Sequence, residues 1–415
     1  MDIHVVGGCY REVCHWPSSD EVYGSGGRAA EVIAQLSQRE GTHLHSVLEA
    51  GLQGRLKSNL ALLSCELHLD ATDQTPIFEY DHPLARPEIY PSRIDLSQAK
   101  KQQIAVEADN ALIFGMLEAD VQVQAKKAVY DPQNAVSPEP FSSTANRAVS
   151  LALVLNRAEA LSFYQQLVGS PAPVDIETEA LADVLLSAEK ACVVVIKCGQ
   201  RGAFVLPRDD QSLWVPAYKT RNVYPIGSGD CFAAAFAYYW MVEALNAVDA
   251  ANHASAVAAF YCDNRTYPDA KSVTKLLEEY QPLSSNGNLD KQVYLAGPFF
   301  NLKEMWLINQ ARQAFKNAGV GVFSPYHDVG PGPAEAVVHQ DIEAIERCDV
   351  FYALFDDGDP GTLFEIGYAI KCGKPVVIYA ETATEEQLKM YEGTGCQIYS
   401  DFSTSIYQAC WSLNA

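Results

Sequence analysis

Short apolar runs of strand length alternate with longer amphipathic stretches along most of the 415-residue chain. Examples of the apolar runs are residues 111–114, 193–197 and 350–355. Strands that alternate with helices in this way are typical of parallel α/β architecture. The pattern therefore predicts an α/β protein built on parallel sheets.

A polar segment interrupts this alternation at residues 281–290, which read QPLSSNGNLD. It holds Pro, Ser, Asn and Gly and shows no hydrophobic period, as is typical of a linker. A new apolar run, KQVYLAG, begins directly after it. We therefore expect a first domain over residues 1–280, a linker at 281–290 and a second domain over residues 291–415.

In the second domain the pattern predicts four strands that alternate with three helices. The strands are expected at residues 293–296, 321–323, 350–355 and 375–379, and the helices at 302–317, 333–347 and 362–371. Such a unit forms a doubly wound parallel sheet, whose site lies outside the carboxyl ends of the strands.

The net charge and the cysteine content indicate which binding partners and which cellular compartment to expect. A formal net charge of −22, with no run of Lys and Arg, argues against a nucleic-acid polymer or an anionic membrane as partner. No apolar stretch is long enough to span a bilayer, so we expect a cytoplasmic protein. The 11 cysteines are scattered and form no CxxC pair, which indicates reduced core thiols instead of disulfides or metal ligands.

A loop that enters a predicted helix carries four carboxylates within ten residues, namely Asp356, Asp357, Asp359 and Glu365. Crowded carboxylates raise one another's pKa, so that one can act as an acid while another stays ionised. Cleavage of a glycosidic bond needs this division of roles, because a carboxylate attacks the anomeric carbon and a proton reaches the leaving group. The alternative is structural, because Thr362 and Glu365 also have the spacing of a capping box.

Asp341 favours the catalytic interpretation of this loop. Val338, Ile342 and Ile345 define one apolar face of the second predicted helix, and Asp341 lies on that face. A carboxylate that faces the core is costly unless it is paired or serves a site. His339 lies off this face and is expected at the surface.

Together these features resemble the nucleoside 2-deoxyribosyltransferase family. The resemblance rests on VYLAGPFF at residues 293–300, QDI at 340–342, CDV at 348–350 and DPGTLFEIGYA at 359–369. It implies a flavodoxin-like domain in which Glu365 is the nucleophile and Tyr294 orients it. Asp341 and Asp359 would handle the base or its proton.

The same resemblance implies which residues contact the substrate. It does not decide which molecule accepts the ribosyl group from the enzyme. Water as acceptor would make a hydrolase, and a second base would make a transferase. The segment 330–333, which reads GPGP, supplies few amide donors for a phosphate, and this favours nucleosides over nucleotides. The family also implies a homo-oligomer and no cofactor for this domain. The implied substrate contacts are Gly297, Pro298, Phe299, Gly361 and Thr362.

A second motif, PIGSGDCFAAAF, occupies residues 225–236 of the first domain. Two glycines at a loop-to-helix junction leave backbone amides free to face an anion. Asp230, in the first helical turn, can take a proton from an attacking hydroxyl. The alternative is a tight turn followed by an Asp that the helix dipole favours.

With three other segments this motif resembles the ribokinase-like (PfkB) family of sugar and nucleoside kinases. These segments are the strand expected at residues 3–8, GGRAA at 26–30 and NRAE at 156–159, with a further match at 194–203. The resemblance implies ATP and Mg²⁺ as cofactors and Asp230 as catalytic base. It implies an anion hole at Gly227, Ser228 and Gly229, and Asn156 and Glu159 near the magnesium ion.

The segments that would hold the acceptor sugar depart from this family more than the segments that would transfer the phosphoryl group. Glu31 replaces an Asn, residues 8–10 read GCY where an Asp is usual, and Lys197 replaces a small polar residue. Two interpretations follow. In the first, a kinase for a sugar or nucleoside is fused to a glycosyl-transfer enzyme. In the second, a non-catalytic module senses a ligand and controls a glycosidase that depletes nucleosides or NAD.

Overall fold

The structure is a computed structural model and describes residues 2–38, 40–92, 95, 101–134, 137–283 and 291–413. Its contacts separate into two compact units, which we call the first unit (Met1–Thr220 and Tyr224–Ser285) and the second unit (Arg221–Val223 and Asn286–Ala415). Most of the expected linker, residues 284–290, lies outside the described residues.

A nine-stranded sheet forms the centre of the first unit, in the order β13-β12-β11-β10-β9-β8-β1-β4-β5. The pairs of β11 with β12 and of β12 with β13 are antiparallel, and the others are parallel. The strands are β1 (Ile3–Val6), β4 (Thr42–Glu49), β5 (Cys65–Thr72), β8 (Gln102–Phe114), β9 (Ala119–Asp131), β10 (Arg147–Asn156), β11 (Val193–Lys197), β12 (Ala203–Pro207) and β13 (Leu213–Val215).

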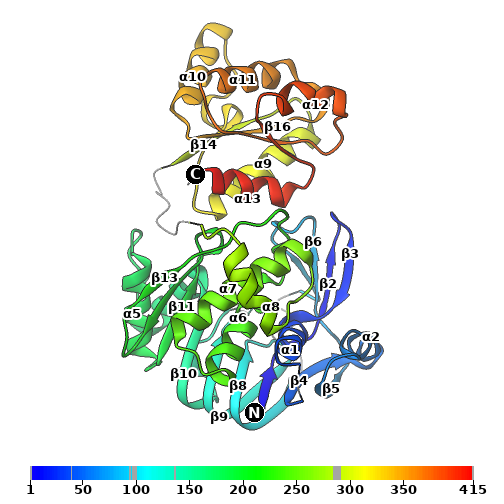
Figure 1. Cartoon of the computed structure of the whole chain (residues 1–415), viewed down its shortest axis with the longest axis vertical. Coiled ribbons are helices and arrows are strands. Elements are labelled where there is room, and N and C mark those ends of the chain that lie inside the picture. Colours follow the sequence, from blue (N-terminus) through cyan, green and yellow to red (C-terminus); the bar gives the residue numbers. More distant parts are fainter. Residues whose placement is uncertain are drawn as a thin grey trace. The chain divides into compact units, whose positions relative to one another are not determined.

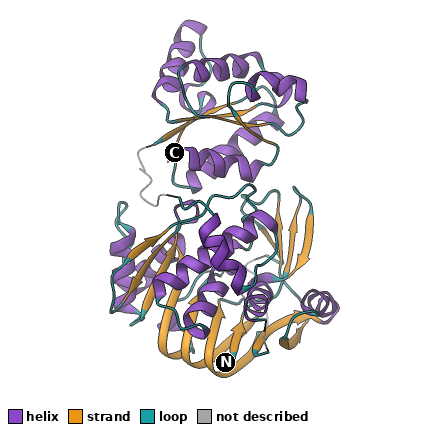
Figure 2. Cartoon of the chain, viewed as in Figure 1, coloured by secondary structure: helices purple, strands orange, loops and turns teal. Residues whose placement is uncertain are grey.

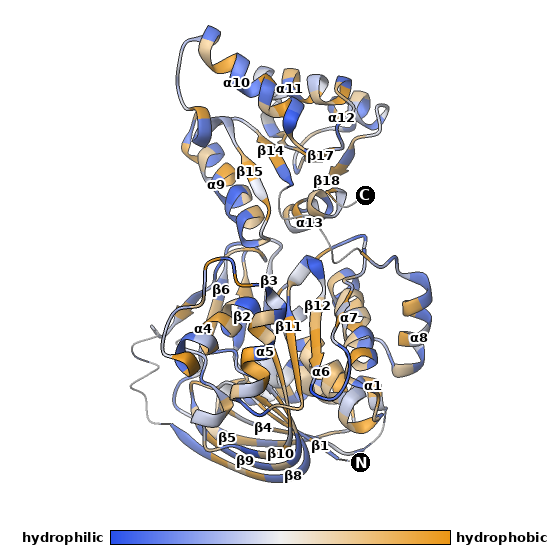
Figure 3. Ribbon diagram, turned by 90° about the vertical axis from the view of Figure 1, so that its left-hand side faces the viewer, coloured by the Kyte–Doolittle hydropathy of each residue, from blue (hydrophilic) through white to orange (hydrophobic). Residues whose placement is uncertain are grey.

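Helices bury the apolar side chains of this sheet in two clusters. In one cluster α1, α6 and α7 pack on the sheet, and in the other α4 and α5 do so. Figure 3 shows how hydrophobic β11, β12 and α6 are. The helices are α1 (Gly24–Ser37), α2 (Ala50–Leu60), α4 (Arg157–Val168), α5 (Thr178–Ala188), α6 (Ser228–Ala237), α7 (Ala247–Asn264) and α8 (Ala270–Glu279). A smaller sheet holds β2 (Arg11–Cys14), β3 (Ser19–Val22), β6 (Ile77–Tyr80) and β7 (Glu88–Tyr90).

Strands β8 and β9 bend back on themselves. They pair in parallel over their whole length of 13 residues each, yet residues 115–118 alone connect them. A straight strand of this length would span about 43 Å, whereas four linking residues reach less than about 20 Å. The two ends of each strand must therefore lie near one another, and Figure 2 shows the resulting curl.

The second unit is a five-stranded parallel sheet in the order β15-β14-β16-β17-β18. In chain order this is 2-1-3-4-5, the flavodoxin-like order of a doubly wound sheet. Helices α9 and α13 cover one face, and α10 and α11 cover the other (Figure 1). The elements are β14 (Gln292–Ala296), α9 (Leu302–Asn317), β15 (Gly321–Phe323), α10 (Ala334–Arg347), β16 (Val350–Leu354), α11 (Pro360–Lys371), β17 (Val376–Tyr379), α12 (Glu385–Glu392), β18 (Gln397–Tyr399) and α13 (Phe402–Ser412).

The predicted fold class is confirmed, with local corrections. All seven elements expected in the second unit are present, but α11 begins at Pro360, two residues before the predicted start. The helix opened by the paired glycines of the first unit begins at Gly24. The small mixed sheet of the first unit and the last three elements of the second were not predicted. All 11 cysteines are free, although Cys372 is exposed and so is not a core thiol.

Gly202 offers a test of the packing in the first unit. It has φ 85° and ψ −139°, a conformation that is open almost only to glycine, and a Cβ there would overlap the carbonyl oxygen of Val215. We expect Gly202→Ala to lower the free energy of unfolding by more than about 2 kcal/mol. Urea denaturation followed by circular dichroism measures this loss.

Gly169→Ala is the matched control, because Gly169 also has a positive φ of 80° but open space around the position of a Cβ. It should cost only about 1 kcal/mol, from backbone strain alone. Equal losses in the two variants would contradict the overlap with Val215.

Candidate active site

The hydroxyl of Tyr294 donates a hydrogen bond of 2.8 Å to Oε1 of Glu365. Tyr294 lies on β14, and Glu365 lies in the second turn of α11. The ring of Tyr294 is fully buried and stacks on Phe351 and Phe323, at centroid distances of 5.1 and 5.5 Å. Because both its ring and its hydroxyl are held, Tyr294 fixes the position of one carboxylate oxygen.

Two further carboxylates act on Glu365. Burial raises the pKa of Glu365 to about 7, and the charges of Asp341 and Asp359 contribute to the rise, while the Tyr294 hydroxyl opposes it. Burial also raises the pKa of Asp341 to about 6. Asp341 Oδ1 is buried and has no hydrogen-bond partner among the described residues. A buried polar atom without a partner is unusual and indicates a site for a ligand.

The start of α11 tests the structural interpretation of Glu365. The N-cap is Asp359, whose Oδ2 accepts hydrogen bonds from the Thr362 amide at 2.8 Å and from its hydroxyl at 2.9 Å. The capping box expected as the alternative, with Thr362 as its first residue, is therefore wrong. Asp356 is also structural, because its Oδ1 accepts from the amide and hydroxyl of Thr382. Glu365 is left free for the site.

The remaining predicted residues of the second unit lie around the ends of β14 and α11. Gly297 and Pro298 follow β14, and a Cβ at Gly297 would lie 3.0 Å from Leu354 Cβ of the neighbouring strand. Phe299 packs against Tyr326, with ring centroids 5.4 Å apart. Gly361 is exposed in the first turn of α11.

The apolar face predicted for α10 is only partly correct. Ile345 is buried, as expected, but Val338 is 49% exposed because it lies near the exposed start of the helix. Asp341 is half-buried at the point where α10 passes α11. His339 is exposed, as predicted.

In the first unit, Asp230 is buried at the start of α6 and already has partners. Its Oδ1 accepts a 2.6 Å hydrogen bond from Gln133, and its Oδ2 lies 3.9 Å from Arg28 Nε. Gly227, the N-cap of α6, has φ 81°, and a Cβ there would overlap the Arg28 side chain. The Arg28 side chain thus lies directly beside Asp230 and Gly227.

Arg28 is itself held by a buried carboxylate. Its two terminal nitrogens donate to Glu12 Oε2 at 3.0 and 2.6 Å, and its guanidinium lies over the rings of Tyr23 and Tyr261. Burial raises the pKa of Glu12 to about 7, although the charge of Arg28 opposes this rise. Removing one partner of such a pair costs several kcal/mol, because the other is left buried and unpaired.

A second ion pair lies beside the anion hole. Lys197 Nζ is 2.5 Å from Asp131 Oδ2, and a Cβ at Gly229 would lie 3.6 Å from the same ammonium. The charges of Glu159 and Asp230 also raise the pKa of Lys197. A single ammonium therefore lies among three carboxylates.

Asn156 and Glu159 form the cap of α4. Asn156 Oδ1 accepts from the Glu159 amide at 2.9 Å, and Glu159 Oε2 accepts from the Asn156 amide at 2.7 Å. These contacts make a capping box.

Sequence reasoning missed the residues that pair with the predicted site of the first unit. Glu12 and Gln133 are distant from Asp230 in the chain, and no local sequence pattern predicts that they lie near it. Lys197 and Arg28 were identifiable from the sequence, because both lie in segments that resemble the kinase family. The carboxylate with which each one pairs could be identified only from the fold.

Two family models match the chain. Residues 293–399 match the nucleoside 2-deoxyribosyltransferase model, and residues 97–266 match the model of the pfkB family carbohydrate kinases. The chain thus joins a deoxyribosyltransferase-like segment to a pfkB-like segment. We call the corresponding parts the kinase-like unit and the deoxyribosyltransferase-like unit. The pfkB match includes Asp230 and Lys197 but begins after Glu12 and Arg28.

Solved structures show the fold of the kinase-like unit. The chain is similar to ribokinase from Thermotoga maritima, with 16% identity, a TM-score of 0.50 and coverage of 67% of this chain and 100% of that one. Ribokinase from Giardia lamblia gives 14% identity and a TM-score of 0.50, with coverage of 67% and 99%. The kinase-like unit therefore has a ribokinase-like fold. No curated protein matches the chain.

None of the helices in the described ranges combines the length and the apolar character that a membrane crossing requires.

The raised pKa of Glu365 predicts how stability changes with pH. The pKa is about 7 in the folded chain, above the ordinary value of 4.5, so folding favours the protonated form. The contribution of protonated Glu365 to the free energy of unfolding is fully present below about pH 4.5 and is lost as the pH rises through about 7. We expect Glu365→Gln to escape this loss. Its unfolding free energy relative to the wild type should rise by about 2 kcal/mol between about pH 5 and pH 8.

Urea denaturation at several pH values measures this difference. Glu343→Gln is the control, because it removes an exposed carboxylate from α10. If the stability of Glu365→Gln relative to the wild type did not change with pH, burial would not raise the pKa of Glu365, and the prediction would be wrong.

Proposed function

We propose that the deoxyribosyltransferase-like unit cleaves or exchanges the N-glycosidic bond of a nucleoside, with Glu365 as nucleophile. The observation that carries this proposal is the grouping of Tyr294, Asp341 and Asp359 around Glu365. Tyr294 binds Glu365 directly, and the charges of Asp341 and Asp359 act on Glu365. The match of this segment to the deoxyribosyltransferase family supports the same reaction.

In the first step, a Glu365 oxygen forms a bond to the anomeric carbon. The bond from that carbon to the base nitrogen breaks, and its electron pair leaves with the base, which takes up a proton. Asp341 is better suited than Asp359 to supply this proton. Asp341 Oδ1 has no hydrogen-bond partner in the described ranges, whereas Asp359 accepts two hydrogen bonds as the cap of α11.

In the second step the acceptor attacks the same carbon and releases Glu365. A second base would be the acceptor in a transferase, and water would be the acceptor in a hydrolase. The family match favours the transferase. A homo-oligomer is part of this proposal, and exposed apolar side chains near the site support it. They are Phe300, Leu302, Trp306 and Phe364, with exposures of 73, 82, 44 and 60%.

The two pKa values set the pH dependence of the first step. Glu365 must be ionised and Asp341 protonated, yet the pKa of Glu365 is about 7 and that of Asp341 about 6. Only a minority of the molecules therefore has Glu365 ionised and Asp341 protonated at the same time. This fraction is largest at the pH midway between the two pKa values. We expect a bell-shaped rate profile with its maximum near about pH 6.5.

Release of free base tests both the reaction and its residues. The purified chain is incubated with ribonucleosides, deoxyribonucleosides, their monophosphates and NAD, with and without a second base, and the products are separated by chromatography. We expect release from a nucleoside by the wild type and by Glu343→Gln, and none by Glu365→Gln. Tyr294→Phe should lower the maximal rate and move the maximum of the profile to higher pH, because Glu365 loses the donor that stabilises its charge.

Release that survives in Glu365→Gln would show that another group is the nucleophile. If no substrate of the panel releases base even with an acceptor present, the glycosyl-transfer function itself is wrong.

For the kinase-like unit, the ion pairs favour the second interpretation, a ligand-sensing module without phosphoryl transfer. Arg28 occupies the space beside Asp230 and Gly227, where an acceptor hydroxyl would have to meet the base. The side chains present also do not fit a magnesium ion held by Asn156 and Glu159, because these residues cap α4 together. Lys197 already supplies a cation to Asp131.

This module retains the means to bind an anion. The amides at the start of α6 and the ammonium of Lys197 lie together, and both favour a phosphate group. We therefore propose that the unit binds a nucleotide and thereby controls the glycosyl-transfer unit.

Calorimetry and a turnover assay test this role. We expect ATP to bind the full chain and Lys197→Met to weaken that binding, because the charge beside the anion hole is lost. No ADP should form with ribose or any nucleoside as acceptor. ADP formation that disappears in Asp230→Asn would establish the kinase in place of the sensor.

A further inference from the structure

Four histidines gather on one face of the large sheet of the kinase-like unit. His4 lies on β1, His43 and His45 on β4, and His68 on β5. The strand register places His4 opposite His43 and His45 opposite His68. The rings of each pair stack with centroids 4.4 Å apart. Sequence analysis assigned no metal ligands to this region.

Three ligand atoms converge at the edge of this array. His68 Nε2 lies 3.5 Å from His43 Nδ1, and Glu66, which faces His43 in the register, completes the group. Glu66 Oε2 is 3.2 Å from His43 Nδ1, and Glu66 Oε1 is 3.5 Å from His68 Nε2. Two ligands of a tetrahedral zinc ion are about 3.3 Å apart, given metal–ligand distances of about 2.0–2.1 Å. One ligand atom from each of the three residues lies within 4.8 Å of the others, which is close to the spacing of a metal site.

Two further histidines lie behind these ligands, because His4 stacks on His43 and His45 stacks on His68. The stacked rings of His4 and His45 would hold the ligand rings in place, as supporting contacts commonly do around metal sites.

We propose that His43, Glu66 and His68 bind one divalent transition-metal ion of the zinc class. Two imidazoles and a carboxylate suit such an ion, and three protein ligands leave a position for water. The site opens to solvent, because β5 is the last strand of the sheet and the side chains of Glu66 and His68 are 64 and 41% exposed. This is the group of three metal-ligating residues that the described part of the chain brings together.

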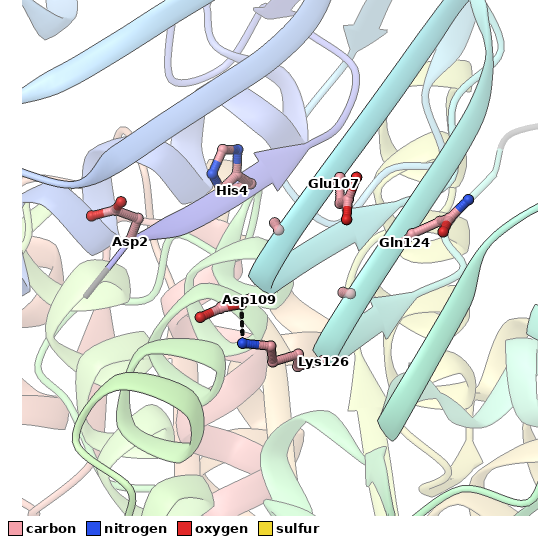
Figure 4. A pocket seen from close by; sticks show the side chains of 8 residues that line it. Asp2, His4, Glu107, Asp109, Gln124 and Lys126 are labelled. Atoms are coloured by element: carbon pink, nitrogen blue, oxygen red, sulfur yellow. Dashed lines mark ion pairs between the residues drawn. The ribbon is translucent and has the colours of Figure 1, made fainter.

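The cavity next to the array adds negative charge. It has a volume of about 600 Å³ and lies at the bend of β8 and β9, and His4 forms part of its wall (Figure 4). Lys126 is paired with Asp109 at 2.7 Å, so Asp2 and Glu107 leave the wall with a net negative charge. A cation near His4 is thus electrostatically favoured. None of the predicted site residues lines this cavity, so the metal proposal is independent of the glycosyl-transfer proposal.

The full chain, stripped of metal with a chelator, provides the test. We expect it to bind one Co²⁺ per chain with the visible absorption of a tetrahedral site, and Zn²⁺ to displace the Co²⁺. His68→Asn and Glu66→Gln should each weaken binding by at least about tenfold. Both residues are exposed, so the variants should fold, and circular dichroism checks this.

His15→Asn is the matched control. His15, in the turn after β2, also faces a carboxylate, because its Nε2 lies 2.7 Å from Glu79 Oε1 on β6, but this pair lies outside the three-residue group. It should bind Co²⁺ as the wild type does. Equal binding by the wild type and His68→Asn would assign the metal to other groups, such as the cysteines, and overturn the proposal. Absence of binding by the wild type would do the same.

Discussion

The hydrogen bond between Tyr294 and Glu365 is the contact on which the chemistry proposed for the second unit depends. A buried carboxylate is costly, and a donor in a fixed position offsets part of that cost while leaving the other oxygen available. Tyr294 can serve as this donor because two aromatic rings hold it in the sheet. Glu365 can accept from it because Asp359 caps α11 in its place. The local structure of the helix thus leaves Glu365 available for the proposed role of nucleophile.

The two candidate sites hold their buried carboxylates differently. In the second unit, Asp341 keeps a buried oxygen that has no partner among the described residues, and burial raises its pKa. In the first unit, Glu12 is paired with Arg28 and Asp131 with Lys197, although Arg28 Nε itself has no hydrogen-bond partner among the described residues. A carboxyl group without a partner is available to transfer a proton, whereas a carboxylate held in an ion pair is less so. This difference supports the proposal that the second unit is the catalytic one.

The sequence predicted the second unit better than the first. Short strands that alternate with amphipathic helices gave all but the last three elements, and a carboxylate on a helix face drew attention to Asp341. The exposure of Val338 could not be seen, because it depends on where α10 leaves the sheet. The cap of α11 was misjudged because Asp359 and Thr362 both suit that role. The roles proposed for Glu365, Asp341 and Asp359 remain predictions.

What the sequence could not supply was the pairing of distant strands. The triplets HLH at 43–45 and ELH at 66–68 each place two polar side chains on one face of a strand, and this much is readable from alternation. That β4 and β5 are neighbours, in the register that sets His43 opposite Glu66, is a property of the sheet. A shift of the register by one residue would turn one triplet to the other face and separate the three ligand atoms. The proposed metal site is therefore a product of register, just as the pairing of Arg28 with Glu12 is a product of the fold.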